Sequence, residues 1–325
     1  IKLPLIISVI FFGLFSFGIN FYFAYVTADD LLKSSIDKRF DQAFVFYDEK
    51  IKEQASMQEI ALYSLSQNLG LSNALERQDI ETIKQLATPI FERFNQQNHI
   101  THFYFIRPDK TVLYRAHSPE RKNDLVNRET LKVASEKQHV ISGMEFGYIG
   151  SFTLRSVQPV WIKNVLIGYI ELGMEVGHVV VQTESQLDIN LVELIDKSYV
   201  KDNIIASILK HTGREANDSA LADYVVTYNK NASVSESDFD ALTKLGVSQG
   251  GQLKLAENKV IRSRDMLDYS GQRIGFLNII EDTSTEIAQR NNSLKSTFLY
   301  HCLVMFLGVL LFGIVFLGRE VCCLS

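Results

Sequence analysis

Two long apolar segments, one near each end of the chain, most constrain how it can fold. They cover residues 3–26 and 297–318. A helix rises about 1.5 Å per residue, so each segment is long enough to cross a hydrocarbon core of about 30 Å. A cleavable signal peptide usually has a shorter apolar region that ends at a small-residue cleavage site. The sequence therefore predicts transmembrane helices at residues 1–27 and 297–318, with a short cytoplasmic tail at residues 319–325.

The charges that flank these segments predict their orientation. Lys2 precedes the first segment and Arg319 follows the second, whereas Asp29 and Asp30 lie just after the first. Because basic residues are retained on the cytoplasmic side of a membrane, both termini are expected in the cytoplasm and residues 28–296 outside it. All of the cysteines fall in or beyond the second segment. The outer part therefore cannot depend on disulfides, which suits a bacterial periplasm.

The remaining composition excludes several functional classes. The chain has 325 residues and a net charge of -5 with no basic block, so nothing favours nucleic-acid binding. No serine or threonine lies in a recognisable nucleophile motif, and the sequence has no phosphate-binding loop. His99 and His102 alone are too few ligands for a metal site. We expect a protein that is not an enzyme, with no catalytic residues, metal or cofactor.

The part of the chain at residues 28–100 is predicted to be helical. Apolar residues recur every three to four positions across residues 29–69, which predicts one long amphipathic helix. Its apolar stripe could pack on the core of the outer domain or form a dimer seam, and both alternatives remain open. A second helix is predicted at residues 78–96, after a break at residues 68–70, with a kink at Pro89.

Two groups of short alternating segments predict two β-sheets. The first group, in residues 101–188, ends in a connecting helix at residues 176–187. Its predicted strands are residues 102–106, 111–117, 151–160 and 165–173. The second group, in residues 189–296, includes a helix at residues 235–245 and an exit helix at residues 284–292. Its predicted strands are residues 189–195, 222–228, 252–255, 259–266 and 273–280.

Charged residues lie within or beside the apolar runs of the first group. They are Arg115, Glu145, Arg155 and Glu171. An unpaired ion is costly to bury, so these side chains need partners, either from each other or from a ligand. A guanidinium suits a carboxylate, and Glu145 could bind an ammonium group. The candidate ligand-binding residues, with aromatic side chains as apolar walls, are Tyr104, Arg115, Glu145, Phe146, Arg155, Trp161 and Glu171.

These residues allow two hypotheses. In one, the first sheet holds a small amphoteric or carboxylated metabolite. In the other, the charged residues form an internal ion network that only holds the sheet together.

A series of short motifs runs through the same region in a fixed order. They are Pro108-Asp109, Arg115-x-His117-x-Pro119-Glu120, Asn123-Asp124-Leu125 with Arg128, Gly143-x-Glu145-x-Gly147-x-x-Gly150, Arg155-x-Val157-x-Pro159-Val160 and Ile167-Gly168-x-Ile170-Glu171-Leu172-Gly173. Together they resemble the extracytoplasmic double Cache sensor domains of bacterial transmembrane receptors, in particular the third double-Cache type. The family pattern has Gly where this chain has Asn123, and Asn also tolerates left-handed turn conformations.

The resemblance implies an α+β fold in which two PAS-like Cache sheet units are stacked on a long N-terminal helix and flanked by two transmembrane helices. The first unit would be membrane-distal and the second membrane-proximal. It also implies the ligand-sensing, periplasmic part of a signalling receptor in the bacterial inner membrane. Such a receptor would bind a small-molecule ligand in the distal unit and signal through the second transmembrane helix. The expected partners are this ligand, the lipid bilayer and a second copy in a homodimer, with no nucleic acid.

Similar domains precede output modules such as diguanylate cyclases or histidine kinases, and the sequence contains no recognisable one. The chain starts without methionine and stops shortly after Gly318, so we expect a fragment or a truncated gene product. Two alternatives to a ligand sensor remain. A ligand-free tether, or a docking surface for a periplasmic binding protein, would have a filled, nonpolar distal sheet and an exposed apolar patch. A periplasmic enzyme would need a cleft with a perturbed acid and base pair.

Overall fold

The computed structural model describes residues 2–146, 152–200, 223–228, 252–256 and 258–322. The chain divides into two compact units. The first contains Ile1–Asp41, Ala256–Lys259 and Asp282–Ser325, and the second contains Gln42–Leu255 and Val260–Glu281. The predicted helix at residues 235–245 lies outside the described residues.

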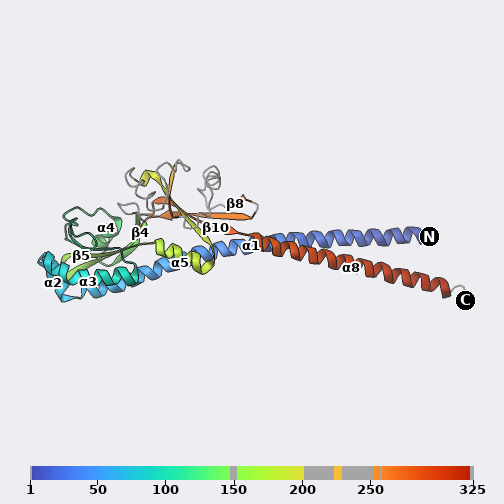
Figure 1. Cartoon of the computed structure of the whole chain (residues 1–325), viewed down its shortest axis with the longest axis horizontal. Helices are drawn as coiled ribbons and strands as arrows, with labels where there is room; N and C mark the ends of the chain where they lie inside the picture. Colours follow the sequence, from blue (N-terminus) through green and yellow to red (C-terminus); the bar gives the residue numbers. More distant parts are fainter. Residues whose placement is uncertain (1, 147–151, 201–222, 229–251, 257, 323–325) are drawn as a thin grey trace. The chain divides into compact units, whose positions relative to one another are not determined.

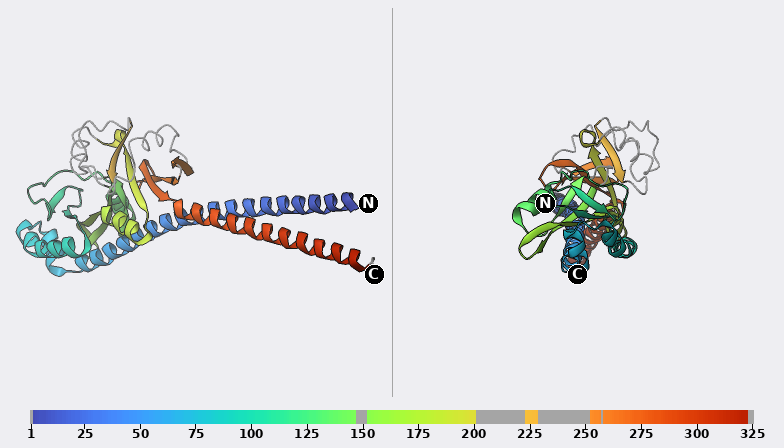
Figure 2. Two further views of the ribbon diagram at one scale, coloured as in Figure 1. Left: turned by 45° about the vertical axis from the view of Figure 1, so that its right-hand side comes forward. Right: turned by 90° about the vertical axis from the view of Figure 1, so that its left-hand side faces the viewer.

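Two long helices, α1 (Lys2–Ser66) and α8 (Ser284–Cys322), supply most of the first unit. Within this unit they run side by side, with the start of α1 and the end of α8 at the same end of the pair (Figures 1 and 2). The sequence analysis separated each transmembrane segment from its neighbouring helix, whereas the structure joins them. Residues 27–28 and 293–296 contain no Pro or Gly, and extending a helix costs far less than starting a new one.

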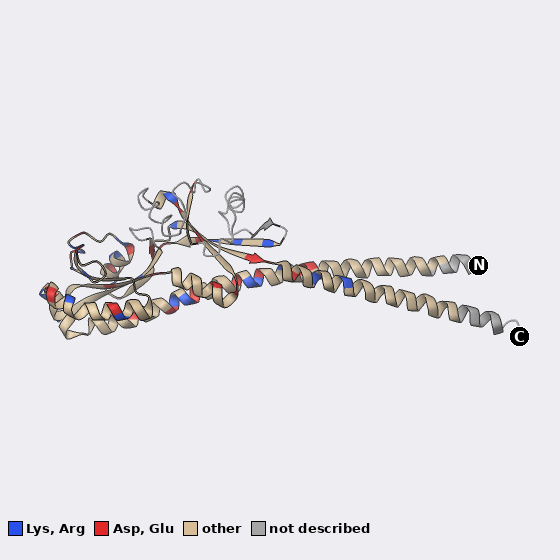
Figure 3. Ribbon diagram, in the orientation of Figure 1, with Lys and Arg blue, Asp and Glu red and all other residues tan. Residues whose placement is uncertain are grey.

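The two helices of the first unit contact each other through aromatic and charged side chains. The ring centroids of Phe17 and Phe298 lie 5.6 Å apart. Arg290 Nη2 lies 3.3 Å from Asp29 Oδ1. Figure 3 shows mostly uncharged residues in the half of α1 toward the N-terminus and in the half of α8 toward the C-terminus. Each helix is therefore long and apolar enough to cross a membrane.

The second unit contains a five-stranded antiparallel sheet made from the first predicted group of strands. Its order is β2-β1-β5-β4-β3. The strands are β1 (His102–Ile106), β2 (Val112–Arg115), β3 (Ile141–Phe146), β4 (Phe152–Ile162) and β5 (Val165–Glu175). The sequence analysis did not predict β3, because Ser142 and Gly143 interrupt its apolar alternation. Pairing with β4 supplies the backbone hydrogen bonds that make this segment a strand.

Two short helices precede this sheet and cover one of its faces together with α1. They are α2 (Leu69–Glu76) and α3 (Ile80–Asn98). The predicted break is present at Gln67 and Asn68, between α1 and α2. It is shorter than expected, because the side chain of Asn68 accepts a hydrogen bond from Leu71 N and caps α2. Pro89 lies inside α3 without dividing it. Burial of Ile83 and Ala87 of α3 offsets the loss of one backbone hydrogen bond there.

The opposite face of the first sheet carries α4 (Glu129–Lys137), which the sequence analysis did not predict. Leu131 and Ala134 of α4 pack with Tyr104 and Tyr169 of the sheet in one buried cluster. Successive strand residues point to opposite faces, so the residues of β5 that alternate with Tyr169, including Glu171, share the α4 face.

A second five-stranded sheet follows the connecting helix α5 (Gly177–Leu187) and has the order β7-β6-β10-β9-β8. Its strands are β6 (Asn190–Asp196), β7 (Tyr224–Tyr228), β8 (Gln252–Ala256), β9 (Lys259–Leu267) and β10 (Arg273–Asp282), with a short 3-10 helix η1 (Lys197–Tyr199) after β6. Val192, Phe276 and Ile280 belong to its buried core. The predicted α+β class, with two antiparallel sheets and a long N-terminal helix, is confirmed.

In the second unit, side chains of both sheets form hydrogen bonds with α1. Ser142 Oγ of β3 donates a hydrogen bond to Glu59 Oε1 over 2.7 Å. Arg264 of β9 donates to both carboxylate oxygens of Asp48, over 2.6 and 2.7 Å. The second half of α1 is therefore shared support for the two sheets.

The two sheets also meet directly at the turn between β9 and β10. Tyr269 N donates a hydrogen bond to Met144 O of β3 over 2.7 Å, and the Tyr269 side chain packs against the buried cluster of the first sheet. A Cβ added at Gly143 would lie 2.1 Å from Tyr269 Cδ2. The ring therefore fits only because β3 has a glycine at this position.

Glu193 of β6 is a buried acid in the second sheet. It is 5% exposed, and Thr227 Oγ1 donates to its Oε2 over 3.3 Å. Its Oε1 has no hydrogen-bond partner among the residues that the structure describes. Burial consequently raises the pKa of Glu193 to about 7. Burial, together with the charge of Glu193, also raises the pKa of Tyr47 on α1.

Glu193→Gln is expected to remove a pH dependence of stability. The folded-state pKa lies above the ordinary value of 4.5, so the folded chain binds this proton more tightly than the unfolded chain. The stability contributed by Glu193 should therefore fall as the pH rises from about 4.5 to about 7. Above this range the free energy of unfolding of the variant should exceed that of the wild type by on the order of 3 kcal/mol. Urea unfolding at about pH 5 and pH 8 measures this difference, and an equal effect of the variant at both pH values would contradict the prediction.

Candidate functional site

A cavity of about 810 Å³ lies on the α4 face of the first sheet. Its strand residues are His102, Tyr104, Arg115 and Arg155. The segment between β2 and α4 covers it with His117, Ser118, Glu120, Arg121, Lys122, Asp124, Leu125, Val126, Asn127 and Arg128. A cavity of this volume is in the range of small-molecule sites.

Strand pairing brings the polar residues of this face together. Tyr104 of β1 lies opposite Arg115 of β2 on one side and opposite Glu171 of β5 on the other. Arg155 of β4 pairs with Gly173, two residues beyond Glu171 in β5. Because alternate strand residues share a face, these side chains project from the sheet to the same side.

The Glu171 carboxylate is the centre of a buried ion cluster. Arg155 Nη1 donates to Glu171 Oε1 over 2.8 Å, and Arg128 Nη1 donates to the same oxygen. The side chains of Glu171 and Arg155 are 0% and 2% exposed. Arg155 Nε also lies 3.9 Å from Glu145 Oε2, while Glu145 Oε1 accepts a hydrogen bond from Thr130 N over 2.7 Å. These charged residues thus find partners in each other and in Arg128.

Arg115 is bound by the covering segment. Its two Nη atoms donate to the two carboxylate oxygens of Asp124 over 2.7 and 2.6 Å, and Nη1 also donates to Arg121 O over 2.6 Å. Asn123, just before this acid, has a φ of +69°, in the left-handed region. This conformation explains why Asn replaces Gly here without disturbing the motif. The segment is therefore fastened to the end of β2 by a bidentate ion pair.

Aromatic rings lie between the guanidinium groups of the cavity. The Tyr104 ring centroid lies 5.0 Å from Arg115 Cζ and 4.8 Å from Arg128 Cζ. Arg128 Nη2 also donates to Tyr104 Oη over 3.1 Å. The His117 ring centroid lies 4.8 Å from those of both Tyr104 and His102. These contacts fix the guanidinium groups in position by cation–π attraction as well as by hydrogen bonds.

Burial keeps the histidines of this cavity neutral. Burial and the charge of Arg155 lower the pKa of His102 to about 2. Burial and the charge of Arg115 lower the pKa of His117 to about 4. Burial raises the pKa of Glu145 above its ordinary value. At neutral pH, the positive charge of the cavity therefore comes from its Arg and Lys side chains.

The cavity lining carries more positive than negative charge. The cationic side chains are Arg115, Arg121, Lys122, Arg128 and Arg155, and the acidic ones are Glu120 and Asp124. The Nε atoms of Arg115 and Arg155 are buried and have no hydrogen-bond partner within the described part of the chain. A buried donor without an acceptor is costly. An anionic ligand such as a carboxylate can supply the missing acceptors.

The structure brings most of the predicted site residues together. Those that line the cavity are Tyr104, Arg115 and Arg155. Glu145 and Glu171 lie beside it and contact Arg155. The sequence analysis missed Arg128 and the other covering residues as site residues. Arg128 belongs to a motif noted in the sequence, but the motif gives no sign that this segment folds over the sheet.

Two predicted site residues lie elsewhere. Phe146 follows Glu145 in β3 and so belongs to the opposite face of the sheet. Trp161 is near the end of β4, after an irregularity in strand pairing at Val160, and is 39% exposed. Neither residue lines the cavity.

The described residues contain no group of three or more His, Cys, Asp or Glu side chains that could hold a metal ion. His99, considered as a ligand in the sequence analysis, stacks on His178 with ring centroids 4.4 Å apart. His102 instead lies in the cavity beside His117.

Comparison with known proteins gives a match over most of the chain. Residues 33–287 match the family dCache_3, described as the double sensory domain of two-component sensor kinase. A search of curated proteins gives no match to this sequence.

Solved structures that resemble the chain are sensor domains of low sequence identity. The periplasmic domain of LuxQ from Vibrio cholerae is 13% identical with a TM-score of 0.45, and the match covers 74% of this chain and 98% of that one. The ligand-binding domain of chemoreceptor Tlp3 from Campylobacter jejuni, in complex with 4-methylisoleucine, is 12% identical with a TM-score of 0.45. That match covers 79% of this chain and 94% of the other. At such values these structures give no information about the ligand of this chain.

Arg155→Met is expected to destabilise the second unit strongly, because it removes one partner of a fully buried carboxylate. Breaking such a pair costs about 3–5 kcal/mol. Lys132→Met is the matched control: it breaks an exposed pair with Glu129, which should cost about 1 kcal/mol or less. Urea unfolding followed by the fluorescence of Trp161, the single tryptophan, measures both variants. An equal loss of unfolding free energy in the two variants would show that the Glu171 cluster is not a main support of the first sheet.

Proposed function

The chain belongs to the dCache_3 family of double sensory domains, as its sequence motifs indicated, and from this premise we propose that it binds a small carboxylated metabolite in the cavity of the first sheet. In this proposal the chain is the periplasmic input part of a transmembrane receptor. It contributes recognition and signal transfer, and any output reaction belongs to a separate module.

The charge of the cavity is the observation that carries this proposal. Cationic side chains outnumber acidic ones in its lining, and two of its arginines keep a buried Nε–H without an acceptor in the described residues. A guanidinium binds a carboxylate in its plane, with charge-assisted hydrogen bonds that are about twice as strong as neutral ones. A carboxylated ligand would therefore supply acceptors for the two Nε–H groups that lack them.

The acidic residues give weaker support for binding an ammonium group. Glu145 already accepts a hydrogen bond from Thr130 N, and burial raises its pKa. Glu171 Oε1 already accepts from two guanidinium groups, while its buried Oε2 has no hydrogen-bond partner among the described residues. We therefore favour recognition of the carboxylate end of a metabolite, whether or not the same molecule carries an amine.

The alternative of a ligand-free tether or docking surface fits this face less well. That alternative expects a filled, nonpolar sheet, whereas this face has a cavity and half of the residues that line it are charged. A concave site with buried guanidinium groups suits a small anion better than a flat protein partner.

Ligand binding by the full chain in lipid nanodiscs should raise the thermal unfolding midpoint. A ligand at about one hundred times its Kd adds about 2.7 kcal/mol of stability. We expect this shift from dicarboxylates or amino acids and not from amines that lack a carboxylate. Arg115→Gln should abolish the shift, because it removes the guanidinium that faces the cavity. Arg77→Gln, an exposed position at the end of α2, should leave the shift unchanged.

Each midpoint is compared with that of the same variant without ligand, so a change in intrinsic stability does not mimic binding. A shift caused equally by amines, or retained in Arg115→Gln, would overturn carboxylate recognition in this cavity. No shift from any compound class would favour the tether or docking alternative.

We further propose that α1 and α8 cross the bacterial inner membrane with both termini in the cytoplasm, and that two copies form a homodimer. The flanking charges of the sequence support the orientation. Val45 and Tyr63 of α1 are 54% and 64% exposed, and they lie five helical turns apart on one face. Exposed apolar side chains on a long helix are positions at which a second copy can pack.

Tyr269 provides a route by which the cavity could act on α8. Its ring packs against the cluster that contains Tyr104, a lining residue of the cavity. The turn that carries Tyr269 leads into β10, and α8 begins at Ser284, shortly after β10 ends at Asp282. A ligand that binds one packing of the two sheets better than another would shift the population between them.

Tyr269→Ala is expected to uncouple ligand binding from α8 while changing ligand affinity little. Spin labels at Asp30→Cys and Asn292→Cys, in a chain whose native cysteines are replaced by Ser, report the spacing of α1 and α8. The ligand identified above should change this distance in the wild type and in Tyr269→Phe, which keeps the ring, but not in Tyr269→Ala. A full distance change in Tyr269→Ala would contradict the proposed route.

A further inference from the structure

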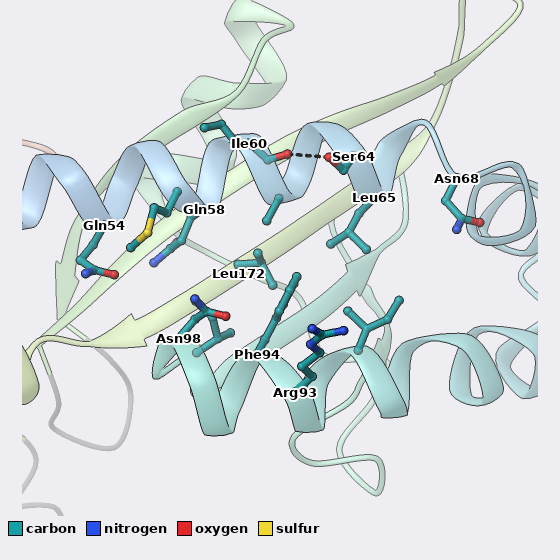
Figure 4. A pocket seen from close by; sticks show the side chains of 14 residues that line it. Gln54, Gln58, Ile60, Ser64, Leu65, Asn68, Arg93, Phe94, Asn98 and Leu172 are labelled. Carbon is teal, nitrogen blue, oxygen red and sulfur yellow. Dashed lines mark hydrogen bonds between the residues drawn. The ribbon is translucent and has the colours of Figure 1, made fainter.

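A second cavity, of about 540 Å³, lies on the other face of the first sheet. It lies between α1, α3 and β5 and is partly open to solvent (Figure 4). Leu172 of β5 lines this cavity, whereas its neighbour Glu171 points to the carboxylate site on the α4 face. The two cavities are therefore separated by the thickness of a single sheet.

Gln58 is the unusual residue of this second cavity. It is only 3% exposed, yet neither Oε1 nor Nε2 has a hydrogen-bond partner in the described part of the structure. Figure 4 shows its side chain extending from α1 into the space between α1 and α3. Leaving both a donor and an acceptor of one amide unsatisfied carries the desolvation cost of each. The amide is thus placed to bond with something that enters the cavity.

The rest of the lining defines what could enter. The walls are largely apolar and include Met57, Ala61, Leu65, Phe94 and Leu172. The charged lining residue is Arg93, which is exposed and donates its Nε–H to Gln97 over 3.2 Å. An anion beside Gln58 would lose its hydration without gaining a buried cation, which is unfavourable. A neutral group that both donates and accepts, on an apolar body, satisfies the amide and the walls together.

We propose that this cavity is a second ligand site, which takes a small apolar molecule carrying a neutral donor and acceptor pair, such as a primary carboxamide, against the side chain of Gln58. The pairing is two parallel hydrogen bonds, one from Nε2 of Gln58 and one to its Oε1. The site does not depend on the carboxylate site, since the two use different residues on opposite faces of the sheet.

Occupation of this site would act directly on α1. The ligand would lie between α1 and α3, with Gln54, Gln58 and Leu65 of α1 against it. It would fix the separation of these two helices at the place where α1 supports the first sheet. The two sites also share β5, so each ligand would change the affinity of the other by the same factor if β5 shifts on binding.

The probe for this site is 4-fluorobenzamide, an aromatic ring that carries a primary carboxamide. Its binding to the full chain in lipid nanodiscs is followed by fluorine NMR line broadening, with empty nanodiscs as the blank. We expect saturable binding that unlabelled benzamide displaces. We expect unlabelled benzoate, which has the same ring with a charged group, not to displace 4-fluorobenzamide.

Gln58→Leu tests the role of the amide. This variant should weaken 4-fluorobenzamide binding by about tenfold or more, because it removes both hydrogen bonds. It should not lower the thermal stability of the chain, since it removes an unsatisfied buried amide. Gln67→Leu is the matched control, with the same substitution at an exposed position outside the cavity, and should bind like the wild type.

Ala61→Phe, which should fill the cavity, is expected to abolish binding independently of Gln58. The proposal is overturned if 4-fluorobenzamide does not bind saturably to the wild type, which would mean that the cavity holds only water. It is also overturned if Gln58→Leu and Gln67→Leu bind the probe equally. Because the deciding readouts follow binding of the neutral amide, failure of this proposal is distinguishable from failure of the carboxylate site.

Discussion

The structure of the first sheet depends on one buried carboxylate. Glu171 is fully enclosed in β5, and its charge is tolerable only because Arg155 and Arg128 donate to it. Arg155 comes from the neighbouring strand, and Arg128 comes from the end of the segment that covers the sheet. The same contacts therefore hold the sheet, close the covering segment over it and point guanidinium groups toward the cavity. The ion pairs that stabilise the fold therefore also position the guanidinium groups of the proposed anion site.

The two hypotheses drawn from the sequence thus describe one set of residues. The ion network is present, since Arg115, Arg155 and the acids pair within the protein. It is also incomplete, because buried donors of the arginines have no acceptor in the described residues. A network that satisfied all of its own atoms would leave nothing for a ligand to supply. The proposed carboxylate site rests on that difference.

The period-two geometry of β5 also explains how one strand can serve two cavities. Glu171 and Leu172 are neighbours in sequence and point to opposite faces. One face carries the charged cavity beside α4, and the other carries the more apolar cavity between α1 and α3. Both faces connect to elements that lead toward the first unit along the chain: Tyr269 and β10 toward α8, and Gln58 within α1 itself. The sheet is therefore the element on which the two proposed ligands would act together.

The sequence by itself determined the apolar helices, most strands of both sheets and the family motifs, because these depend on local periodicity and turn chemistry. It also singled out Arg115, Glu145, Arg155 and Glu171, since charge in an apolar run is visible in one dimension. Only the tertiary structure decided that β3 is a strand, that Asn68 starts a helix and that Arg128 completes the Glu171 cluster. It alone excluded Phe146 and Trp161 from the cavity lining and left Gln58 buried without a partner. These features depend on contacts between residues far apart in the chain, and no local pattern records which distant group will satisfy a buried charge or amide.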